Sequence, residues 1–410
     1  MANNRLKKKS IWTIPLAISL FIPWLLSAIT LFLSIWIVLP APTFFLLPLG
    51  VGAPEVSPWL IGGNAIALIL TLLKINQSWL YKLPLIASVL GLFLSSLPLL
   101  QFPNANARIA NEMQTVLGAN YLDRVPQTAQ TKMRRQPFIL AEVFRGIPQP
   151  KIRIDRQIPF ANPDGEKLTL NLYRPLATGK YPTIIMIYGG SWRSGTPNND
   201  EKFSSYMASQ DYTVIAIDYR HAPKYRFPIQ LEDVKTALNY IQTHADKLDV
   251  DRSQIALLGR SAGAHLAMLA AYQPDAIPVK AVVNYYGPVN LTKGYYDPPF
   301  PNPINTRNVL ENFLGGTPEE LPELYQKASP INYVKPNLPP TLLVYAGRDH
   351  LVKPKFGRQL YEQLKTSGNQ VLWLEIPWAE HAFDAVFNGV SNQLALYYTE
   401  RFLAWALKSN

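Results

Sequence analysis

The 410-residue sequence predicts an α/β domain with a mostly parallel sheet, preceded by an all-α transmembrane region. From residue 151 onward, short apolar runs with strand character alternate with amphipathic runs with helix character. This alternation is typical of a parallel sheet, here of about eight strands, with helices on both faces. Before residue 104, three long runs contain no Asp, Glu, Lys or Arg, which is typical of membrane-spanning helices.

The elements of the α/β domain (151–410) follow from this alternation. Strands are expected at 151–159, 167–174, 182–188, 213–218, 254–259, 279–285, 341–346 and 371–376. The expected helices include 200–209, 228–245, 262–273, 354–367 and 391–408. The stretch 290–333 interrupts the pattern and is rich in Tyr, Phe and Pro, so we expect it to lie over the site as a partial cap. In such sheets, ligands bind at the carboxyl ends of the strands.

Residues 1–103 are expected to form the membrane region. The candidate spans are 11–39, 58–73 and 83–100. About 20 apolar residues suffice to cross a bilayer, so a cleaved signal peptide is the weaker interpretation of the first run. A buried core helix is the alternative for the shorter second run. Pro23 and the stretch 40–48 can also split the first run into a hairpin, which would change the number of spans.

The distribution of Lys and Arg predicts how these spans are oriented. The basic residues of the region are Arg5, Lys7, Lys8 and Lys9 before the first run, and Lys74 and Lys82 between the second and third runs. The loop between the first and second runs holds Glu55 and no Lys or Arg. Three spans with a cytoplasmic N-terminus fit this pattern and put the α/β domain on the non-cytoplasmic face. Four spans would reverse the assignment.

The net charge of +11 gives little reason to expect a nucleic-acid partner, because nearly half of it belongs to residues 1–103. Residues 104–150 are expected to be a linker, amphipathic over 107–121 and basic thereafter. Its basic residues are Arg124, Lys132, Arg134, Arg135 and Arg145. They suit either anionic headgroups or a solvated face. The chain has no Cys, so disulfides and cysteine–zinc sites are excluded, and no cofactor or metal is expected.

The pentapeptide Gly259-Arg-Ser-Ala-Gly263 lies between a buried strand and a helix-like run. In that setting G-x-S-x-G turns the chain sharply and holds the serine hydroxyl above the sheet edge, at a helix N-terminus. A serine that only caps a helix would not need both flanking glycines. Ser261 is therefore predicted to be a nucleophile.

A nucleophilic serine needs a base to accept its proton. Of the five histidines, only His350 and His381 come late enough for the chain order serine, acid, histidine. His381 follows the strand-like run 371–376 and is the expected base. His265, one helical turn after Ser261, is expected to pack behind the turn.

The base in turn needs a carboxylate that orients it. Asp349 follows the strand-like run 341–346 and is the expected acid. His350 adjoins it, and because neighbouring residues rarely point at one target, His350 is expected in a surface loop. Asp384 and Glu380 are the rival acids, weaker because each lies so close in sequence to His381.

The tetrahedral intermediate of acyl transfer also needs hydrogen-bond donors for its oxyanion. The strand-like run 182–188 leads into Gly189 and Gly190, and glycines allow backbone amides to approach a ligand closely. The predicted oxyanion hole consists of the amides of Gly190, Ser191 and Ala262, with Gly189 in the same turn.

Residues 150–410 resemble an α/β-hydrolase of the carboxylesterase/lipase type, near the hormone-sensitive-lipase and feruloyl-esterase-like branches. The strings that carry the resemblance are Tyr188-Gly-Gly-Ser-Trp192, Asp218-Tyr-Arg-His-Ala-Pro223 with Phe227-Pro228 and Asp233, the serine pentapeptide, Gly347-Arg-Asp349 and His381-Ala-Phe383. The resemblance implies the α/β-hydrolase fold and ester hydrolysis through an acyl-enzyme. A small-molecule or lipid ester is the implied substrate.

The chain departs from the family pattern near the nucleophile. The family usually has His at the position of Tyr188 and Gly at that of Ser191, although both residues still supply backbone amides. Arg260 stands where the family often has Asp or a small polar residue, and a bulky cation there can select substrates. Together with Trp192 and Tyr286, it is expected at the substrate pocket.

Two alternatives to a membrane-anchored serine ester hydrolase remain open. A serine peptidase can use the same fold and the same three residues. A non-catalytic scaffold or binding protein can also retain the fold, but it would be free to lose one of the three. Lipid, prenylcysteine and polysaccharide esters are not distinguished by the sequence.

Overall fold

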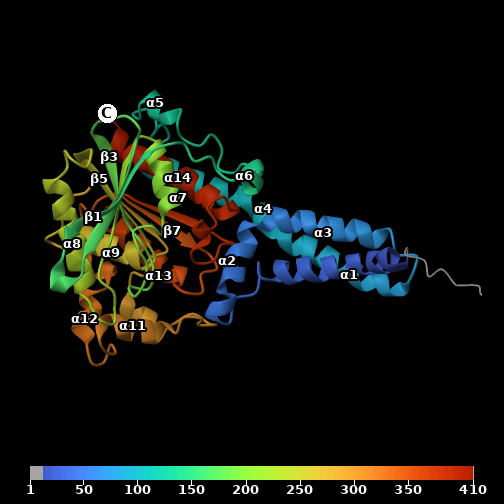
Figure 1. The fold of residues 1–410 in the computed structure, drawn as a ribbon. Coiled ribbons are helices and arrows are strands. Elements are labelled where there is room, and N and C mark those ends of the chain that lie inside the picture. The colour runs from blue at the N-terminus through green and yellow to red at the C-terminus, as the bar shows by residue number, and fades with distance from the viewer. Residues whose placement is uncertain (1–12, 410) are drawn as a thin grey trace, which may run out of the picture.

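The computed structural model describes residues 13–409, and for residues 13–20 it describes the backbone only. An arm of N-terminal helices projects from a globular α/β domain (Figure 1). The first two residues of the expected span 11–39, and the basic residues at positions 5 and 7–9, lie outside the described residues.

Within the described residues, the domain is built on one eight-stranded sheet in the order β1-β2-β4-β3-β5-β6-β7-β8. The strands are β1 (Arg153–Ala161), β2 (Leu168–Arg174), β3 (Tyr181–Ile187), β4 (Thr213–Ile217), β5 (Val250–Arg260), β6 (Ala281–Tyr285), β7 (Thr341–Ala346) and β8 (Val371–Ile376). The pairs β1–β2 and β2–β4 are antiparallel, and the other pairs are parallel. The predicted, mostly parallel sheet is confirmed.

Helices cover both faces of the sheet, and adjacent residues of β6 show which helix lies on which face. The domain helices are α7 (Glu201–Ser209), α8 (Ile229–Thr243), α9 (Ala262–Tyr272), α13 (Pro354–Thr366) and α14 (Val390–Lys408). Asn284 donates to the sulfur of Met268 in α9 at 3.2 Å. The next residue, Tyr285, bonds Thr399 of α14 at 2.8 Å. Because side chains alternate along a strand, α9 and α14 lie on opposite faces.

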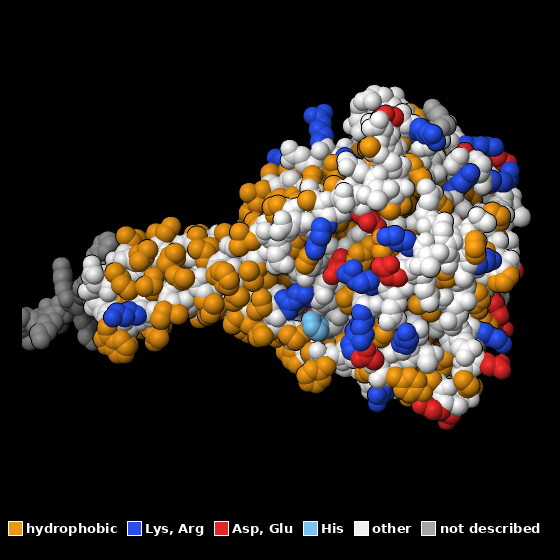
Figure 2. Space-filling view, turned by 180° about the vertical axis from the view of Figure 1, so that it is seen from behind, with side chains coloured by type: hydrophobic (Ala, Val, Ile, Leu, Met, Phe, Trp, Pro, Cys, Tyr) orange, Lys and Arg blue, Asp and Glu red, His pale blue; other side chains and the backbone are white. Residues whose placement is uncertain are grey.

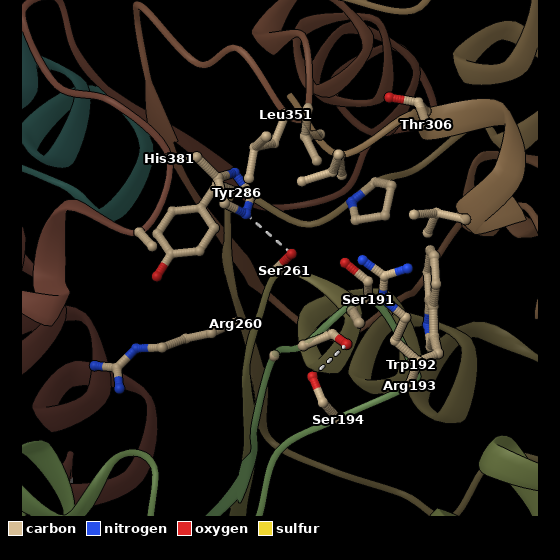
Figure 3. A pocket seen from close by; sticks show the side chains of 18 of the residues that line it. Ser191, Trp192, Arg193, Ser194, Arg260, Ser261, Tyr286, Thr306, Leu351 and His381 are labelled. Atoms are coloured by element: carbon tan, nitrogen blue, oxygen red, sulfur yellow. Dashed lines mark hydrogen bonds between the residues drawn. The ribbon is translucent and has the colours of Figure 1, made fainter. Parts of the chain in front are cut away.

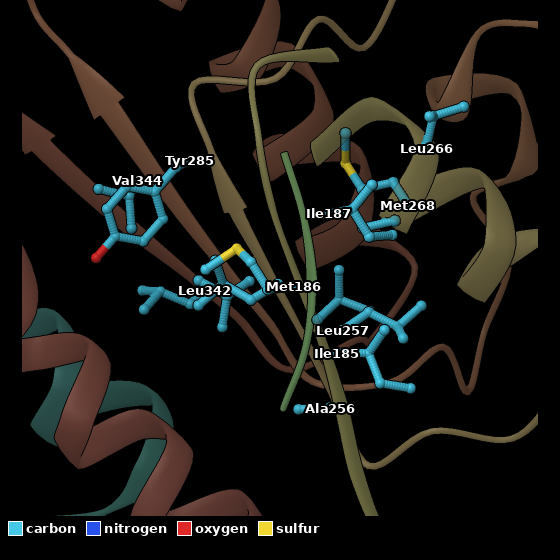
Figure 4. Close-up of a cluster of buried hydrophobic side chains, with 14 of the residues drawn as sticks. Ile185, Met186, Ile187, Ala256, Leu257, Leu266, Met268, Tyr285, Leu342 and Val344 are labelled. Carbon is cyan, nitrogen blue, oxygen red and sulfur yellow. The ribbon is translucent and has the colours of Figure 1, made fainter. Parts of the chain in front are cut away.

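The same alternation fills the core between the layers. In Figure 4, Met186 of β3 points to one side of the sheet with Leu342, while Ile185 and Ile187 point to the other with Leu257. All of these side chains are buried. The carboxyl ends of β3, β5, β7 and β8 lie at one edge, so the loops that follow them meet there.

The insertion after β6 and the smaller elements complete the domain. They are η3 (Pro163–Gly165), α10 (Leu291–Tyr296), α11 (Thr306–Leu314), α12 (Pro322–Lys327), η4 (Pro330–Tyr333) and η5 (Phe383–Ala385). Phe313 and Tyr325 of the insertion are fully buried, so this stretch packs on the domain as part of its main core.

The arm consists of α1 (Thr13–Ile35), η1 (Phe44–Leu46), α2 (Leu47–Glu55), α3 (Ser57–Leu72), η2 (Trp79–Tyr81) and α4 (Lys82–Leu117). Figure 1 shows α1 running toward the domain, α3 running away from it and α4 returning. The start of α1 and the turn between α3 and α4 therefore lie at the tip of the arm, far from the sheet.

Among the described residues, one helical stretch, Trp79–Leu117, is long and apolar enough to cross a membrane. The pair Phe44–Glu55 and Ser57–Leu72 passes the same criterion only when taken together across a bend of 82°. Phe21–Ile35 is a shorter apolar helix. By length and composition alone, the described part of the chain thus has one such helix, or two with the bent pair.

One boundary in the arm differs from that expected. The third apolar helix does not end at residue 100, because α4 continues through Pro98 and Pro103 to Leu117. Its last turns bury Ile109 and Met113 in the main core of the domain, and this packing holds the expected linker stretch in the same helix.

Among the basic residues of the linker, Arg124, Lys132, Arg135 and Arg145 are exposed, and Arg134 alone is buried. The linker contains α5 (Gln127–Gln130) and α6 (Leu140–Arg145). Arg134 is buried and donates to Glu142 at 2.8 Å and to Gln393 of α14 at 2.9 Å. A buried, paired guanidinium belongs neither to a solvated face nor to a headgroup contact, so Arg134 fastens the linker to α14.

Candidate active site

Ser261 lies at the sharp turn between β5 and α9. Its backbone is in an uncommon conformation, with φ 50° and ψ −118°. Such a conformation costs on the order of 1–3 kcal/mol and persists only where the surroundings enforce it. A Cβ atom on Gly263 would lie 2.0 Å from the carbonyl oxygen of Ile187, and one on Gly259 would lie 2.3 Å from Gly263. The close packing of strand, turn and helix therefore requires both glycines.

His381 follows β8 and reaches the serine from the neighbouring loop. Its Nε2 lies 3.0 Å from Oγ of Ser261, as Figure 3 shows. The imidazole is buried, and the ring of Tyr286 packs against it with the centroids 4.5 Å apart. The histidine is thus held in place to accept a proton from the serine hydroxyl.

Asp349 follows β7 and holds the other side of the imidazole. Its Oδ2 lies 2.7 Å from Nδ1 of His381. Its Oδ1 accepts hydrogen bonds from the backbone amides of Leu351 at 2.8 Å and Val352 at 2.7 Å. Nδ1 therefore carries the hydrogen that bonds the carboxylate, and Nε2 is left free to accept from Ser261.

The rival acids have other partners. Asp384 accepts a hydrogen bond from the hydroxyl of Tyr286 and pairs with Arg260. Glu380 accepts from the amide of His381 at 2.9 Å, and it also bonds the amide and the ring of His350. The structure thus brings Ser261, His381 and Asp349 together and leaves both rivals away from Nδ1.

The charges around His381 set its protonation. Burial alone would lower the pKa of the imidazole, because it disfavours the charged form. The charge of Asp349 and the hydrogen bond to it, with further contributions from Glu380 and Asp384, outweigh burial and raise the pKa above 6.5. The site is therefore arranged to stabilise an imidazolium.

The predicted oxyanion loop follows β3 and lies directly against the serine turn. A Cβ on Gly189 would lie 2.8 Å from the carbonyl oxygen of Arg260. Residues 190–192 all have positive φ, of 136°, 56° and 58°. Ala262 opens α9, so its amide has no acceptor within the helix. The backbone of 189–191 and the start of α9 thus border the same space.

A hydrogen-bonded cluster supports this loop where the family pattern has His. The hydroxyl of Tyr188 donates to Asp218 at 2.6 Å and lies 2.9 Å from Nε2 of His221. Its ring stacks on Tyr219 at 4.5 Å, and the hydroxyl of Tyr219 donates to the carbonyl of Tyr188 at 3.1 Å. Burial lowers the pKa of His221 and keeps it neutral. The side chain of Tyr188 is therefore held by Asp218, Tyr219 and His221, and these contacts support the loop that begins at Gly189.

His265 lies behind the turn, as expected, but sequence reasoning missed its partner. Nε1 of Trp192 donates to Nδ1 of His265 at 3.2 Å, and Nε2 of His265 bonds the carbonyl of Ala328 at 2.6 Å. Burial lowers the pKa of His265 to about 4, so the ring is neutral and can accept from the indole. Trp192 also stacks on Phe313, with the ring centroids 4.1 Å apart, so its side chain is fixed on both sides and holds the oxyanion loop in place.

These residues face a cavity of about 880 Å³. Ser261 and His381 line it, as do the predicted pocket residues Trp192, Arg260 and Tyr286. Figure 3 shows Leu351 and Thr306 on one side of Ser261, and Ser191, Arg193 and Ser194 on the other. The expected cap stretch 290–333 supplies part of the wall, including Thr306 and Leu310.

Arg260 does not present a free cation to this cavity. Its side chain turns away from Ser261 (Figure 3) and pairs with Asp200 and Asp384. The guanidinium also lies over the rings of Phe203 at 5.0 Å and Tyr285 at 5.6 Å. We expected the charge of Arg260 to act on the substrate. Instead, this charge is held in buried ion pairs below the serine turn.

Comparison with known proteins finds esterases among those that this chain resembles. The BD-FAE family model matches residues 170–364. Over 244 residues the chain is 32% identical to "Esterase LipC" of Mycobacterium tuberculosis, covering 56% of this chain and 60% of that protein. Over 241 residues it is 30% identical to "Probable carboxylic ester hydrolase LipM" of the same organism, covering 55% of each chain. The domain has an α/β-hydrolase fold and is similar to these esterases.

Solved structures agree on the fold of this α/β-hydrolase domain. "Bacterial Heroin Esterase" superposes with a TM-score of 0.56 at 25% identity, covering 63% of this chain and 85% of that one. An esterase of Pyrobaculum calidifontis superposes with a TM-score of 0.55 at 24% identity, covering 68% and 97%. The chain spans 60% and 55% of the two mycobacterial relatives. The stretch matched by the family model lies wholly within the α/β-hydrolase domain.

Proposed function

We propose that the protein is a membrane-anchored carboxylic-ester hydrolase that works through a Ser261–His381–Asp349 triad. The observation that carries this proposal is the unbroken hydrogen-bonded line from Oγ of Ser261 to Nε2 of His381, 3.0 Å, and from Nδ1 to Asp349, 2.7 Å. It runs along the wall of a large cavity. The relatives named for esterase activity favour an ester over a peptide substrate.

In the proposed reaction, Oγ of Ser261 attacks the ester carbonyl while Nε2 of His381 takes its proton. Asp349 keeps the imidazole in the required tautomer and stabilises its charged form. The amides of Gly190, Ser191 and Ala262 face the developing oxyanion, and Gly189 allows the loop to lie close enough. His381 then gives the proton to the leaving alcohol, and water releases the acyl group by the reverse sequence.

A fluorophosphonate probe tests the triad directly. The full-length protein is expected to be labelled and to lose esterase activity in step with labelling. Ser261→Ala should remove both, whereas Ser253→Ala, at an exposed position at the start of β5, should change neither. Absence of labelling, or labelling that persists in Ser261→Ala, would contradict the proposal.

The arrangement of polar residues in the arm supports the membrane anchor. Small polar side chains face one another between the helices: Ser27 bonds Ser88 at 2.8 Å, and Asn64 donates to Ser34 at 3.0 Å. The outward positions are apolar and exposed, among them Phe21, Leu25, Ile29, Phe32, Ile69, Ile86 and Phe93. Figure 2 shows hydrophobic side chains over the arm, while charged side chains gather on the domain.

Such an inside-out pattern is unfavourable in water and suited to lipid, where helices associate through small and hydrogen-bonding residues. We therefore propose that α1, α3 and α4 are the three spans of residues 1–103. Lys74 and Lys82 flank the turn at the tip of the arm, on the side opposite the domain. By the positive-inside rule, this favours a cytoplasmic tip and a non-cytoplasmic catalytic domain.

Extraction tests the anchor. The full-length protein should stay with the membrane pellet after an alkaline carbonate wash and should enter the supernatant only with detergent. A known peripheral protein of the same membranes serves as the control for complete washing. Release by carbonate alone would contradict integral insertion and leave the triad proposal standing.

A further inference from the structure

The cavity at Ser261 has two chemically different sides. One side is mostly apolar and is formed by Phe44, Pro299, Ile304, Leu310, Leu351 and Phe356, and the same segments also supply the paired charges of Asp297 and Lys353. The other is polar and includes Arg193, Asn199 and Lys202. The volume, about 880 Å³, lies near the upper end of the range of roughly 300–1,000 Å³ for small-molecule sites. The cavity therefore suits an amphipathic ester better than a small, uniformly polar one.

The arm itself supplies part of the apolar side. Phe44 belongs to η1, between α1 and α2, and it lines the same cavity as Ser261 and His381. Leu351, two residues after Asp349, packs against Ala41, Leu47 and Val51 of the arm. The base of the arm is thus a wall of the site.

Hydrogen bonds fix the base of the arm to the loop that carries Asp349 and to the start of α14. Arg348, next to Asp349, donates to the carbonyl of Val38. Glu55, at the end of α2, accepts from the amide of Ser391 at 2.8 Å, a few residues beyond the His381 loop. Because these contacts involve backbone groups of the arm and of α14, the cavity mouth keeps a fixed position relative to the arm.

Exposed aromatic rings flank the apolar side of the mouth. Phe45 is 87% exposed and Phe300 is 94% exposed. Their chain neighbours, Phe44 and Pro299, both line the cavity. Figure 1 shows the loop before α11 reaching toward the segment at the start of α2. Large aromatic side chains this exposed are unfavourable in water and favourable at a bilayer surface, where the arm would hold them.

We propose that the substrate is an ester with a long hydrocarbon chain that enters directly from the bilayer, through the mouth beside Phe44. This inference rests on the proposed function and names the substrate class of that site. The hydrocarbon chain occupies the apolar side, and the polar part of the ester lies toward Arg193 and Lys202. Acylation forms the bond from Oγ of Ser261 to the carbonyl carbon and breaks the bond to the alcohol oxygen, which takes the proton from His381. Water then attacks the acyl carbon, its proton returns through His381 to Oγ of Ser261, and the fatty acid is released.

The test uses the full-length protein in phosphatidylcholine vesicles and two probes. One is 4-methylumbelliferyl palmitate dissolved in the same bilayer, and the other is 4-nitrophenyl acetate in the water. The double variant Phe45→Ser/Phe300→Ser removes both exposed rings. The matched control is Leu176→Ser, which is also an exposed apolar residue. Leu176 follows β2, which runs antiparallel to β4, so it lies at the edge of the sheet opposite the site.

We expect the double variant to lower the ratio of palmitate to acetate hydrolysis at least tenfold and Leu176→Ser to leave that ratio unchanged. The acetate rate shows that the variants are folded. In a second measurement, palmitate ester supplied only in enzyme-free vesicles should be hydrolysed at least tenfold more slowly than ester in the enzyme's own bilayer.

An unchanged ratio in the double variant, or equal hydrolysis from both kinds of vesicle, would overturn entry from the bilayer while leaving the esterase proposal intact. Acetate hydrolysis without any palmitate hydrolysis would overturn the long-chain substrate class. The wild-type protein could also fail to hydrolyse either ester, or fail to react with a fluorophosphonate. Either result would overturn the proposed function itself, and this inference with it.

Discussion

The carboxylate of Asp349 bonds Nδ1 of His381 at 2.7 Å through one oxygen and two amides of its own loop through the other. The amides, of Leu351 and Val352, fix the carboxylate before any substrate is present. Leu351 also packs against the base of the arm. One short loop therefore orients the histidine and joins the domain to the arm.

Replacing Asp349 by Asn should leave the fold intact and lower kcat by about four orders of magnitude, as in serine proteases, because the amide favours the wrong imidazole tautomer. Glu380→Gln is the comparison variant and should lower kcat far less, since Glu380 bonds the backbone amide of His381 and the amide and ring of His350, but not the ring of His381. Steady-state hydrolysis of a soluble ester measures both. Near-full activity in Asp349→Asn would show that another carboxylate orients the imidazole of His381.

The pH profile should show an acid limb with an apparent pKa above 6.5. His381 accepts a proton only when it is neutral, and the charge of Asp349 raises its pKa above that value despite burial. Activity is therefore lost as the pH falls through the raised pKa. The profile of kcat/KM for a soluble ester measures this limb, and an apparent pKa at or below 6.5 would contradict the raised pKa.

Sequence reasoning succeeded where the signal is local. The strands follow from runs of apolar residues, and strand β7 was expected at the residues it occupies, Thr341–Ala346. The order of Ser261, Asp349 and His381 at strand ends was sufficient to expect them together, because parallel strands end at one edge. Their catalytic roles remain predictions.

What the sequence could not predict depends on packing between distant segments. Arg260 pairs with Asp384, more than a hundred residues away, so its charge is neutralised by partners that no local pattern indicates. In the sequence, Phe44 belongs to the stretch 40–48, which bears only on the expected number of spans. It lines the cavity because the chain folds back between α1 and α2. The continuation of α4 depends likewise on core contacts of Ile109 and Met113.

Replacing Arg260 by Met should destabilise the domain by about 3–5 kcal/mol, because it leaves the carboxylates of Asp200 and Asp384 buried without a counter-charge. Thermal unfolding in detergent measures the loss. The triple variant with Asp200→Asn and Asp384→Asn should recover part of it. Arg252→Met is the control, since the pair of Arg252 with Asp246 is largely exposed. Equal effects at the two arginines would contradict a structural role for Arg260.

Ser191→Gly should preserve esterase activity and raise stability slightly, by up to about 1 kcal/mol, because Ser191 holds φ at 56° and glycine relieves the strain of a positive φ. The backbone amide proposed for the oxyanion hole is unchanged by the substitution. Ser194→Gly in the same loop should lower stability, since the φ of Ser194 is not positive, glycine adds chain entropy, and the hydrogen bond from the Ser194 hydroxyl to the carbonyl of Gly190, 3.3 Å, is lost. Loss of activity in Ser191→Gly would assign a role to the hydroxyl itself.

The orientation in the membrane can be tested with single cysteines, because the natural sequence contains none. Gln77 lies in the turn at the tip of the arm and Thr366 at the end of α13, and both side chains are exposed. Three spans with a cytoplasmic tip place these positions on opposite sides of the bilayer. A membrane-impermeant maleimide applied to intact cells, with any outer membrane permeabilised, should label Thr366→Cys and should label Gln77→Cys only after detergent. The reverse pattern would place the catalytic domain in the cytoplasm, and labelling of both positions before detergent would contradict an arm that crosses the membrane.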